Sequence, residues 1–101
     1  MLTTTLFDWA IVELVAEDSP HQKRLFLWGL VSKDLLGRFQ NGDYVFTSLI
    51  TAIYPDSRQV ITKTNHVYNL VGPGQRVKAS GDELEMLRNG YSPGDIELIK
   101  S

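Results

Sequence analysis

Residues 7–16 form an apolar run that is broken only by acidic residues. Between residues 7 and 16 the interruptions are Asp8 and Glu13. Aromatic and β-branched residues occupy alternate positions of this run: Phe7, Trp9, Ile11 and Val15. Alternation of this kind is typical of a β-strand, although a second set of apolar residues at helical spacing leaves a helix as the alternative. We expect the strand.

The next two segments predict a hairpin. Residues 17–22 are polar and include Pro20, so they read as a loop. Residues 25–32 are apolar on both faces, as in a strand at the centre of a sheet. The strands over 7–16 and 25–32 should therefore pair as a long antiparallel hairpin.

The middle of the chain predicts further strands. Asn41–Gly42 suits a tight turn with positive φ, which delivers the chain into a long strand over residues 44–54 that stops at Pro55. Strands over 60–64 and 67–71 flank Asn65–His66, a two-residue hairpin loop.

The last quarter changes character after residues 72–74, where we expect the sheet-rich part to end. Ser80 precedes Glu83 by three residues, which is the spacing of a capping box. The apolar stripe of Leu84, Leu87 and Tyr91 and the stop signal Asn89–Gly90 predict a helix over about residues 81–89. We expect residues 92–94 to form a turn and residues 96–99 a short closing strand.

Together these elements predict one α+β domain over residues 1–101. The sheet should be antiparallel and strongly twisted, or a partly open small β-barrel, with five to six strands and one C-terminal helix.

Composition narrows the functional classes. The chain has 101 residues, of which 43% are hydrophobic and 22% charged, with a net charge of -2 and no cysteine. Without cysteine there is no disulfide framework, thiol nucleophile or Cys-based metal site. The longest apolar run, over residues 25–31, is far shorter than the roughly 20 residues that span a bilayer. We expect a cytoplasmic protein with no membrane partner.

Candidate catalytic residues are few. His21 lies in a predicted loop and His66 in a tight turn, outside any nucleophile–base motif. Asp34 and Asp43 flank one loop, where acidic residues usually cap turns. Residues 72–76 are glycine-rich but lack the Gly-Lys-Ser/Thr ending of a phosphate-binding loop. We therefore predict no enzyme activity and no cofactor or metal.

Nucleic-acid binding by a small barrel is the first alternative. Such a barrel needs exposed aromatic side chains near basic ones. The candidate aromatic residues are Trp28, Phe39, Tyr44, Phe46, Tyr54 and Tyr68, and the basic ones Arg38, Arg58, Lys63 and Arg76. A pI of about 5.6 argues against this function, because nucleic-acid-binding domains are usually basic.

Recognition of another macromolecule, most directly a protein, fits the remaining features best. An exposed sheet edge can accept a partner strand, and Tyr68 with Arg38 or Arg58 would form a common type of hot spot. We predict that partner contacts come from the loops around Arg38 and Gly72 and from the hairpin face with Tyr68. The candidate residues are Arg38, Arg58, His66, Tyr68 and Arg76. A homodimer that covers this edge is the other alternative.

Two stretches carry a resemblance to a known family. They comprise Gly37–Arg38–Phe39, Gly42–Asp43–Tyr44–Val45 and Ser48, followed by Thr62, Thr64–Asn65, Val67–Tyr68, Leu70, Gly72 and Gly74. Over roughly Trp28 to Arg76 the chain resembles a family of small uncharacterised proteins from Gram-negative bacteria and their mobile elements. The resemblance transfers no catalytic residue. It implies a prophage or accessory-DNA setting, in which small binding proteins and inhibitors are frequent. A homodimeric structural or accessory protein of a mobile element is the third functional alternative.

Overall fold

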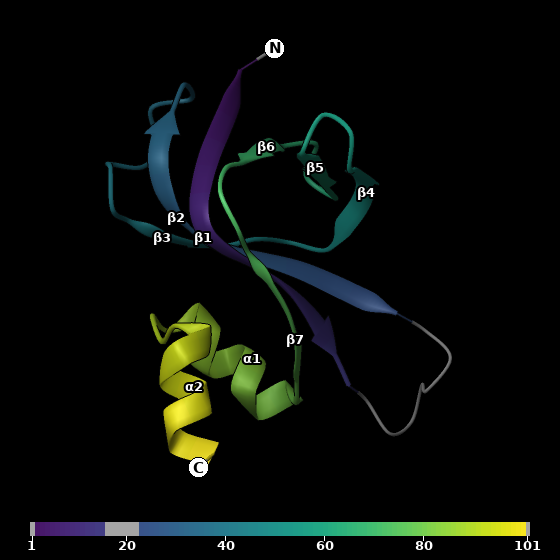
Figure 1. The fold of residues 1–101 in the computed structure, drawn as a ribbon, viewed down its shortest axis with the longest axis vertical. Coiled ribbons are helices and arrows are strands. Elements are labelled where there is room, and N and C mark those ends of the chain that lie inside the picture. Colours follow the sequence, from purple (N-terminus) through teal and green to yellow (C-terminus); the bar gives the residue numbers. More distant parts are fainter. Residues whose placement is uncertain (1, 16–22, 101) are drawn as a thin grey trace.

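The fold is built around one long antiparallel hairpin, as the sequence predicts. The computed structural model describes residues 2–15 and 23–100. Strand β1 (Thr3–Leu14) pairs with β2 (Arg24–Asp34), and both run through the centre of the molecule (Figure 1). The two predicted strands and their pairing are confirmed. The loop predicted over residues 17–22 lies outside the described residues.

The sheet is mixed, which corrects the antiparallel sheet of five to six strands that we predicted. The described residues form five further strands: β3 (Tyr44–Phe46), β4 (Ile50–Tyr54), β5 (Gln59–Thr62), β6 (Val67–Leu70) and β7 (Gln75–Ala79). The strand order is β3-β2-β1-β6-β5-β4, while β7 pairs with β1 beyond β6. Both β6 and β7 run parallel to β1. Because Val77 and Ala79 are the only apolar residues of β7, the sequence pattern missed it.

The strand predicted over residues 44–54 is broken into β3 and β4. The Thr47 N–H donates to the Leu27 carbonyl at 2.9 Å, and the Thr47 hydroxyl accepts from the Leu27 N–H at 3.0 Å. This exchange ends the pairing with β2, and the chain then turns to pair with β5. Phe46 accordingly stacks on Phe26, 5.6 Å between ring centroids, and does not share a continuous face with the residues of β4.

The next hairpin is confirmed, with shorter strands and a longer loop than we predicted. β5 ends at Thr62 and β6 begins at Val67, so the connection spans residues 63–66. The Asn65 N–H donates to the Thr62 carbonyl at 2.8 Å, and Asn65 takes a φ of 63°. Asparagine tolerates this left-handed conformation better than most residues, which explains its place in the turn.

The two ends of the strand order, β3 and β4, are neighbouring segments of the chain, so the sheet curls around one face. It does not close, because β3 and β4 do not pair with each other. The fold is therefore an open, curled sheet and not a closed barrel.

Two short helices follow the sheet, one more than we predicted. The predicted helix is α1 (Gly81–Arg88), and Ser80 and Glu83 form the expected capping box. Its stop signal is also confirmed, since Gly90 takes a φ of 104°. The closing strand predicted over residues 96–99 is wrong, because this segment belongs to α2 (Pro93–Lys100).

A β-bulge lets the central hairpin serve two cores. Phe7 lies opposite Leu30 and Ala10 opposite Trp28, so that two residues of β1, Asp8 and Trp9, face the single residue between them on β2. Since side chains of a strand alternate, one extra residue exchanges the two faces of the strand.

The two cores lie on opposite faces of this hairpin. The inner core, enclosed by the curled sheet, contains Leu6, Ile11, Leu27, Val31, Val45, Val60, Tyr68 and Leu70. The helix core, covered by α1 and α2, contains Ala10, Val12, Phe26, Trp28, Ala79, Leu84, Leu87 and Ile96. Leu6 before the bulge and Ile11 after it thus reach the same core, five positions apart.

The close packing of Gly74 against Trp9 can be tested by substitution. A Cβ atom at this position would lie 2.2 Å from the Trp9 ring, a distance that no real contact allows. We expect Gly74→Ala to lower the free energy of unfolding by about 1–3 kcal/mol in urea denaturation, the usual cost of overpacking. Gly81→Ala is the matched control, because nothing lies within 4 Å of its added carbon. Equal stability of the two variants would contradict the packing described here.

Candidate functional site

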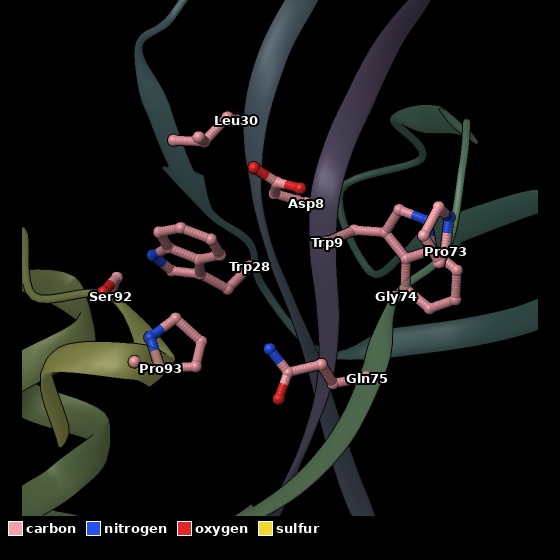
Figure 2. Close-up of a pocket in the computed structure, with 10 residues that line it drawn as sticks. Asp8, Trp9, Trp28, Leu30, Pro73, Gly74, Gln75, Ser92 and Pro93 are labelled. Atoms are coloured by element: carbon pink, nitrogen blue, oxygen red, sulfur yellow. The ribbon is translucent and has the colours of Figure 1, made fainter. Parts of the chain in front are cut away.

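A hollow of about 490 Å³ opens beside the β1 bulge, and we call it the bulge hollow. Four segments meet there: the bulge itself, the neighbouring part of β2, the chain entering β7 and the turn between α1 and α2 (Figure 2). It is lined by Asp8, Trp9, Trp28, Leu30, Pro73, Gly74, Gln75, Ser92, Pro93 and Gly94. Indole, proline and leucine side chains make its walls apolar, and a carboxylate, an amide and a hydroxyl provide polar groups.

Trp28 brings a hydrogen-bond donor without a partner to this hollow. The residue is 5% exposed, and its buried Nε1 has no hydrogen-bond partner among the described residues. A buried donor left unpaired costs about 1–3 kcal/mol, and such groups are rare in folded proteins. In Figure 2 the indole nitrogen lies on the side of the ring toward Ser92. A neutral acceptor such as a peptide carbonyl, on reaching this buried nitrogen, would provide the missing partner.

The neighbouring Trp9 is, by contrast, fully engaged. Its Nε1 donates to the Gly72 carbonyl at 3.2 Å, and the Arg58 guanidinium lies 5.9 Å from the centre of its ring. Trp9 therefore packs against the segment that leads into β7 and fixes it by a hydrogen bond, while the Nε1–H of Trp28 is left without an acceptor.

Asp8 places a carboxylate at the rim of the hollow. It is exposed, and its φ of 49° lies in the left-handed region that favours glycine. A residue with a side chain gives up about 1 kcal/mol in this conformation, although aspartate tolerates it better than most. Strained residues of this kind cluster at functional sites. The sequence pattern marked Asp8 only as an interruption of a strand.

The turn between the helices forms the opposite wall and is fixed by a second capping box. The Ser92 hydroxyl accepts from the Asp95 N–H at 3.1 Å, and the Asp95 carboxylate accepts from the Ser92 N–H at 2.9 Å. Because Asp95 already offsets the helix dipole, this end of α2 favours a neutral acceptor over an anion. The motif Ser92-Pro93-Gly94-Asp95 is the sequence signal of a helix start, so the turn predicted over residues 92–94 is wrong.

A second polar cluster surrounds the buried carboxylate of Asp34. The Thr4 hydroxyl donates to Oδ1 at 2.6 Å, while the backbone N–H groups of Arg38 and Phe39 donate to Oδ2 at 2.6 and 2.9 Å. The side chain of Asp34 is 0% exposed, and the Arg38 guanidinium lies 3.9 Å from it. Asp34 therefore caps the loop between β2 and β3, as we predicted for the acidic residues there.

These contacts set the pKa of Asp34. Burial acts to raise the pKa, but the hydrogen bonds from Thr4 and from the backbone of Arg38, Phe39 and Leu36 outweigh it and hold the pKa below its usual value. The carboxylate is thus charged at neutral pH and stabilises the loop.

Two of the sequence-predicted binding residues meet at this cluster. Arg38 Nη1 lies 3.0 Å from His66 Nδ1, and Arg38 Nη2 donates to the Thr4 hydroxyl at 3.0 Å. His66 also lies 3.1 Å from the Thr64 hydroxyl. The Arg38 and His66 side chains therefore link the loop between β2 and β3 to the loop between β5 and β6.

The other three predicted residues lie elsewhere. Arg58 donates to the carbonyls of Leu70 and Gly72, which makes it a clamp on the β6–β7 connection. Arg76 is exposed on β7, opposite Ile11. Tyr68 is 3% exposed and lies in the inner core, so the predicted hairpin face with Tyr68 on the surface is wrong. The five residues do not form one surface.

Of the remaining chemical candidates, the structure describes Asp43 and not His21. Asp43 caps its own turn by accepting from the Gln40 N–H at 2.9 Å, and His21 lies outside the described residues. Among residues 2–15 and 23–100, no three His, Asp or Glu side chains gather in a way that could hold a metal ion. Neither helix of this part of the chain has the length and apolar character to cross a bilayer.

Comparison with known proteins places the chain in a family. The family model for a domain of unknown function, DUF6957, matches residues 3–86. The chain belongs to this family. Searches of the curated proteins and of the solved structures found no match. The match is wider than the resemblance over Trp28–Arg76, since it includes β1 and most of α1, and it leaves the Gram-negative and mobile-element setting a prediction.

The matched domain includes only part of the lining of the bulge hollow. The lining residues from Asp8 to Gln75 lie within the matched domain, whereas Ser92, Pro93 and Gly94 lie beyond its end. The bulge and the chain that leads into β7 therefore lie within the domain that the family shares. The turn before α2, which forms the opposite side of the hollow, lies after the end of that domain.

The Asp34 cluster yields a pH-dependent prediction. Asp34→Asn should lower the free energy of unfolding at neutral pH by about 2 kcal/mol, because an amide replaces a charged acceptor in a buried site. The folded-state pKa of Asp34 is lowered. Its stabilisation is therefore complete above the unfolded-state pKa of about 3.9 and is lost as the pH falls through the folded-state value.

Urea denaturation between pH 7 and acid measures this effect. The wild-type protein should lose stability in acid more steeply than Asp34→Asn, and the exposed replacement Glu97→Gln should follow the wild type. Parallel acid profiles of the wild type and Asp34→Asn would show that Asp34 does not stabilise the loop.

Proposed function

We propose that this protein is a non-catalytic binding protein that recognises an extended segment of another protein in the bulge hollow. The observation that carries the proposal is the buried, unpartnered Nε1 of Trp28 in that hollow. A buried donor that has no acceptor among the described residues is stabilised when a ligand brings the acceptor.

A peptide segment matches the polar groups of the hollow. Each peptide unit offers a carbonyl acceptor for the Trp28 N–H and an N–H donor for the Asp8 carboxylate. Apolar or proline side chains of the segment would pack between Pro73 and Pro93. Proline-rich extended peptides are known to dock in aromatic-lined grooves.

The charges of the molecule favour protein over nucleic acid as partner. Among the residues that the structure describes, no lysine or arginine lines the hollow, and Asp8 would repel a phosphate. Arg38 and Arg58, two of the basic residues considered for nucleic-acid binding, already donate to acceptors within the fold. The binding surface therefore shifts from the predicted Tyr68 face to the hollow, with Asp8, Trp28 and Gln75 as its contact residues.

Site-specific crosslinking in native cells tests the proposal. A photo-crosslinking amino acid in place of the exposed Gln75 should yield an adduct with a discrete protein, whereas the same group at Asn41, outside the hollow, should not. In the Trp28→Phe background a smaller aromatic ring replaces the indole and the N–H donor is lost. The adduct yield should then fall about two- to tenfold, the worth of one hydrogen bond.

Three results would contradict the proposal: no protein adduct at position 75, adducts with nucleic acid alone, or equal adducts at positions 75 and 41. An undiminished yield in Trp28→Phe would remove the indole from the binding mechanism. Thermal unfolding of each variant confirms that it is folded.

A further inference from the structure

A second hollow, of about 220 Å³, opens onto the inner core, and we call it the core hollow. Its lining comes from β1, β4, β5, β6 and the loop between β4 and β5. The lining residues are Trp9, Ile11, Ile53, Tyr54, Pro55, Arg58, Gln59, Val60 and Leu70. Among the residues that the structure describes, Trp9 is the only one that lines both hollows. The core hollow is therefore a separate site.

The surface of the core hollow is mainly apolar. Its buried part consists of Ile11, Val60 and Leu70, which belong to the inner core. Ile53 and Tyr54, by contrast, are 37% and 51% exposed, so they leave apolar surface in contact with water. Concave apolar sites with a small number of polar groups are typical of small-ligand binding. A ligand that covers these side chains would be stabilised by the hydrophobic effect.

Arg58 brings a positive charge to this apolar surface. Its Nε donates to the Leu70 carbonyl at 3.0 Å, and its Nη2 donates to the Gly72 carbonyl. Among the described residues, its Nη1 has no hydrogen-bond partner and no carboxylate forms an ion pair with the guanidinium. An anionic group of a ligand would therefore find both a charge and a donor at Arg58.

The backbone of Arg58 carries a local cost. Its φ of 56° lies in the left-handed region, which is unfavourable for a residue with a side chain. Residues held in this way cluster at functional sites. The two backbone carbonyls explain two of the three guanidinium nitrogens, and a ligand at Nη1 would use the third.

We propose that the core hollow binds a small aromatic carboxylate. The carboxylate accepts from Arg58 Nη1, and the aromatic ring packs against Trp9 and Tyr54. Hydrogen bonds between arginine and a carboxylate are among the stronger ones in proteins, and aromatic pairs add to the burial of apolar area. The Arg58 guanidinium lies 5.9 Å from the centre of the Trp9 ring, so one small molecule can reach both groups.

The size of the hollow limits the ligand. An apolar cavity of about 150 Å³ holds one benzene ring. The core hollow, at about 220 Å³, therefore accommodates one ring or two fused rings, with the acid group at Arg58. The two hollows also differ in charge, because the bulge hollow has the carboxylate of Asp8 and the core hollow has Arg58.

A two-dimensional NMR titration of the amide and indole N–H groups with naphthalene-2-carboxylate tests the proposal. The dissociation constant should be about 1 mM or lower, as expected for a ligand of this size. The Trp9 Nε1–H and the amides of residues 56–60 should shift, whereas the Trp28 Nε1–H in the bulge hollow should not. The neutral naphthalene-2-carboxamide should bind about tenfold more weakly, because it forms no hydrogen bond between two charged groups.

Three variants identify the groups that hold the ligand. Arg58→Gln should remove the difference between the two probes, since the carboxamide does not use the charge. Tyr54→Ala should weaken both probes about two- to tenfold, the value of an aromatic pair. Tyr91→Ala is the matched control, because Tyr91 is 45% exposed and lines neither hollow, and it should leave both affinities unchanged. Thermal unfolding confirms that each variant is folded.

The absence of NMR shifts at millimolar concentrations of the carboxylate would overturn the proposal. Equal affinity of the wild-type protein for the carboxylate and the carboxamide would also overturn it, and this comparison holds even if Arg58→Gln does not fold. Shifts that centre on Trp28 would place the probe in the bulge hollow and contradict the proposed site. Because the probe and the photo-crosslinker report on different hollows, failure of one proposal leaves the other standing.

Discussion

The structure depends on one constraint: the central strand β1 must present apolar side chains to two cores on opposite faces of the same hairpin. A regular strand alternates its faces along its whole length, so Leu6 and Ile11 could not both point into the inner core. The bulge at Asp8 and Trp9 resolves this conflict by adding one residue opposite β2. The curled sheet then encloses the inner core on one face, and α1 and α2 cover the helix core on the other.

The same bulge makes the candidate site. It separates the segment of β1 that pairs with β6 from the segment that pairs with β7, and the chain crossing between them passes over Trp9. The left-handed backbone of Asp8 and the unpartnered indole of Trp28 both lie beside this crossing. Folded proteins tolerate such local costs mainly where a ligand or a partner makes use of them. The architecture of the sheet and the proposed binding function therefore have a common physical origin.

Much of the fold could be predicted from local patterns, and the site could not. Alternation in β1, the two apolar faces of β2 and the capping box at Ser80 each act within a few residues, so the sequence displays them. The break at Thr47 and the burial of Tyr68 depend on partners far along the chain, Leu27 in the first case and the inner core in the second. The hollow likewise joins four segments of the chain, and only Ser92-Pro93-Gly94-Asp95 carried a local signal, the start of α2.

The stability of a variant that lacks Asp8 tests this account most directly. Deleting Asp8 removes the bulge. The side chains of residues 9–14 must then either point to the opposite core or shift their register against β2, so we expect no cooperative unfolding transition in urea. Asp8→Gly keeps the bulge and relieves its positive φ, and it should be as stable as the wild type or about 1 kcal/mol more stable. If the deletion variant unfolded cooperatively with wild-type stability, β1 would not need the bulge to serve two cores, and the account would be wrong.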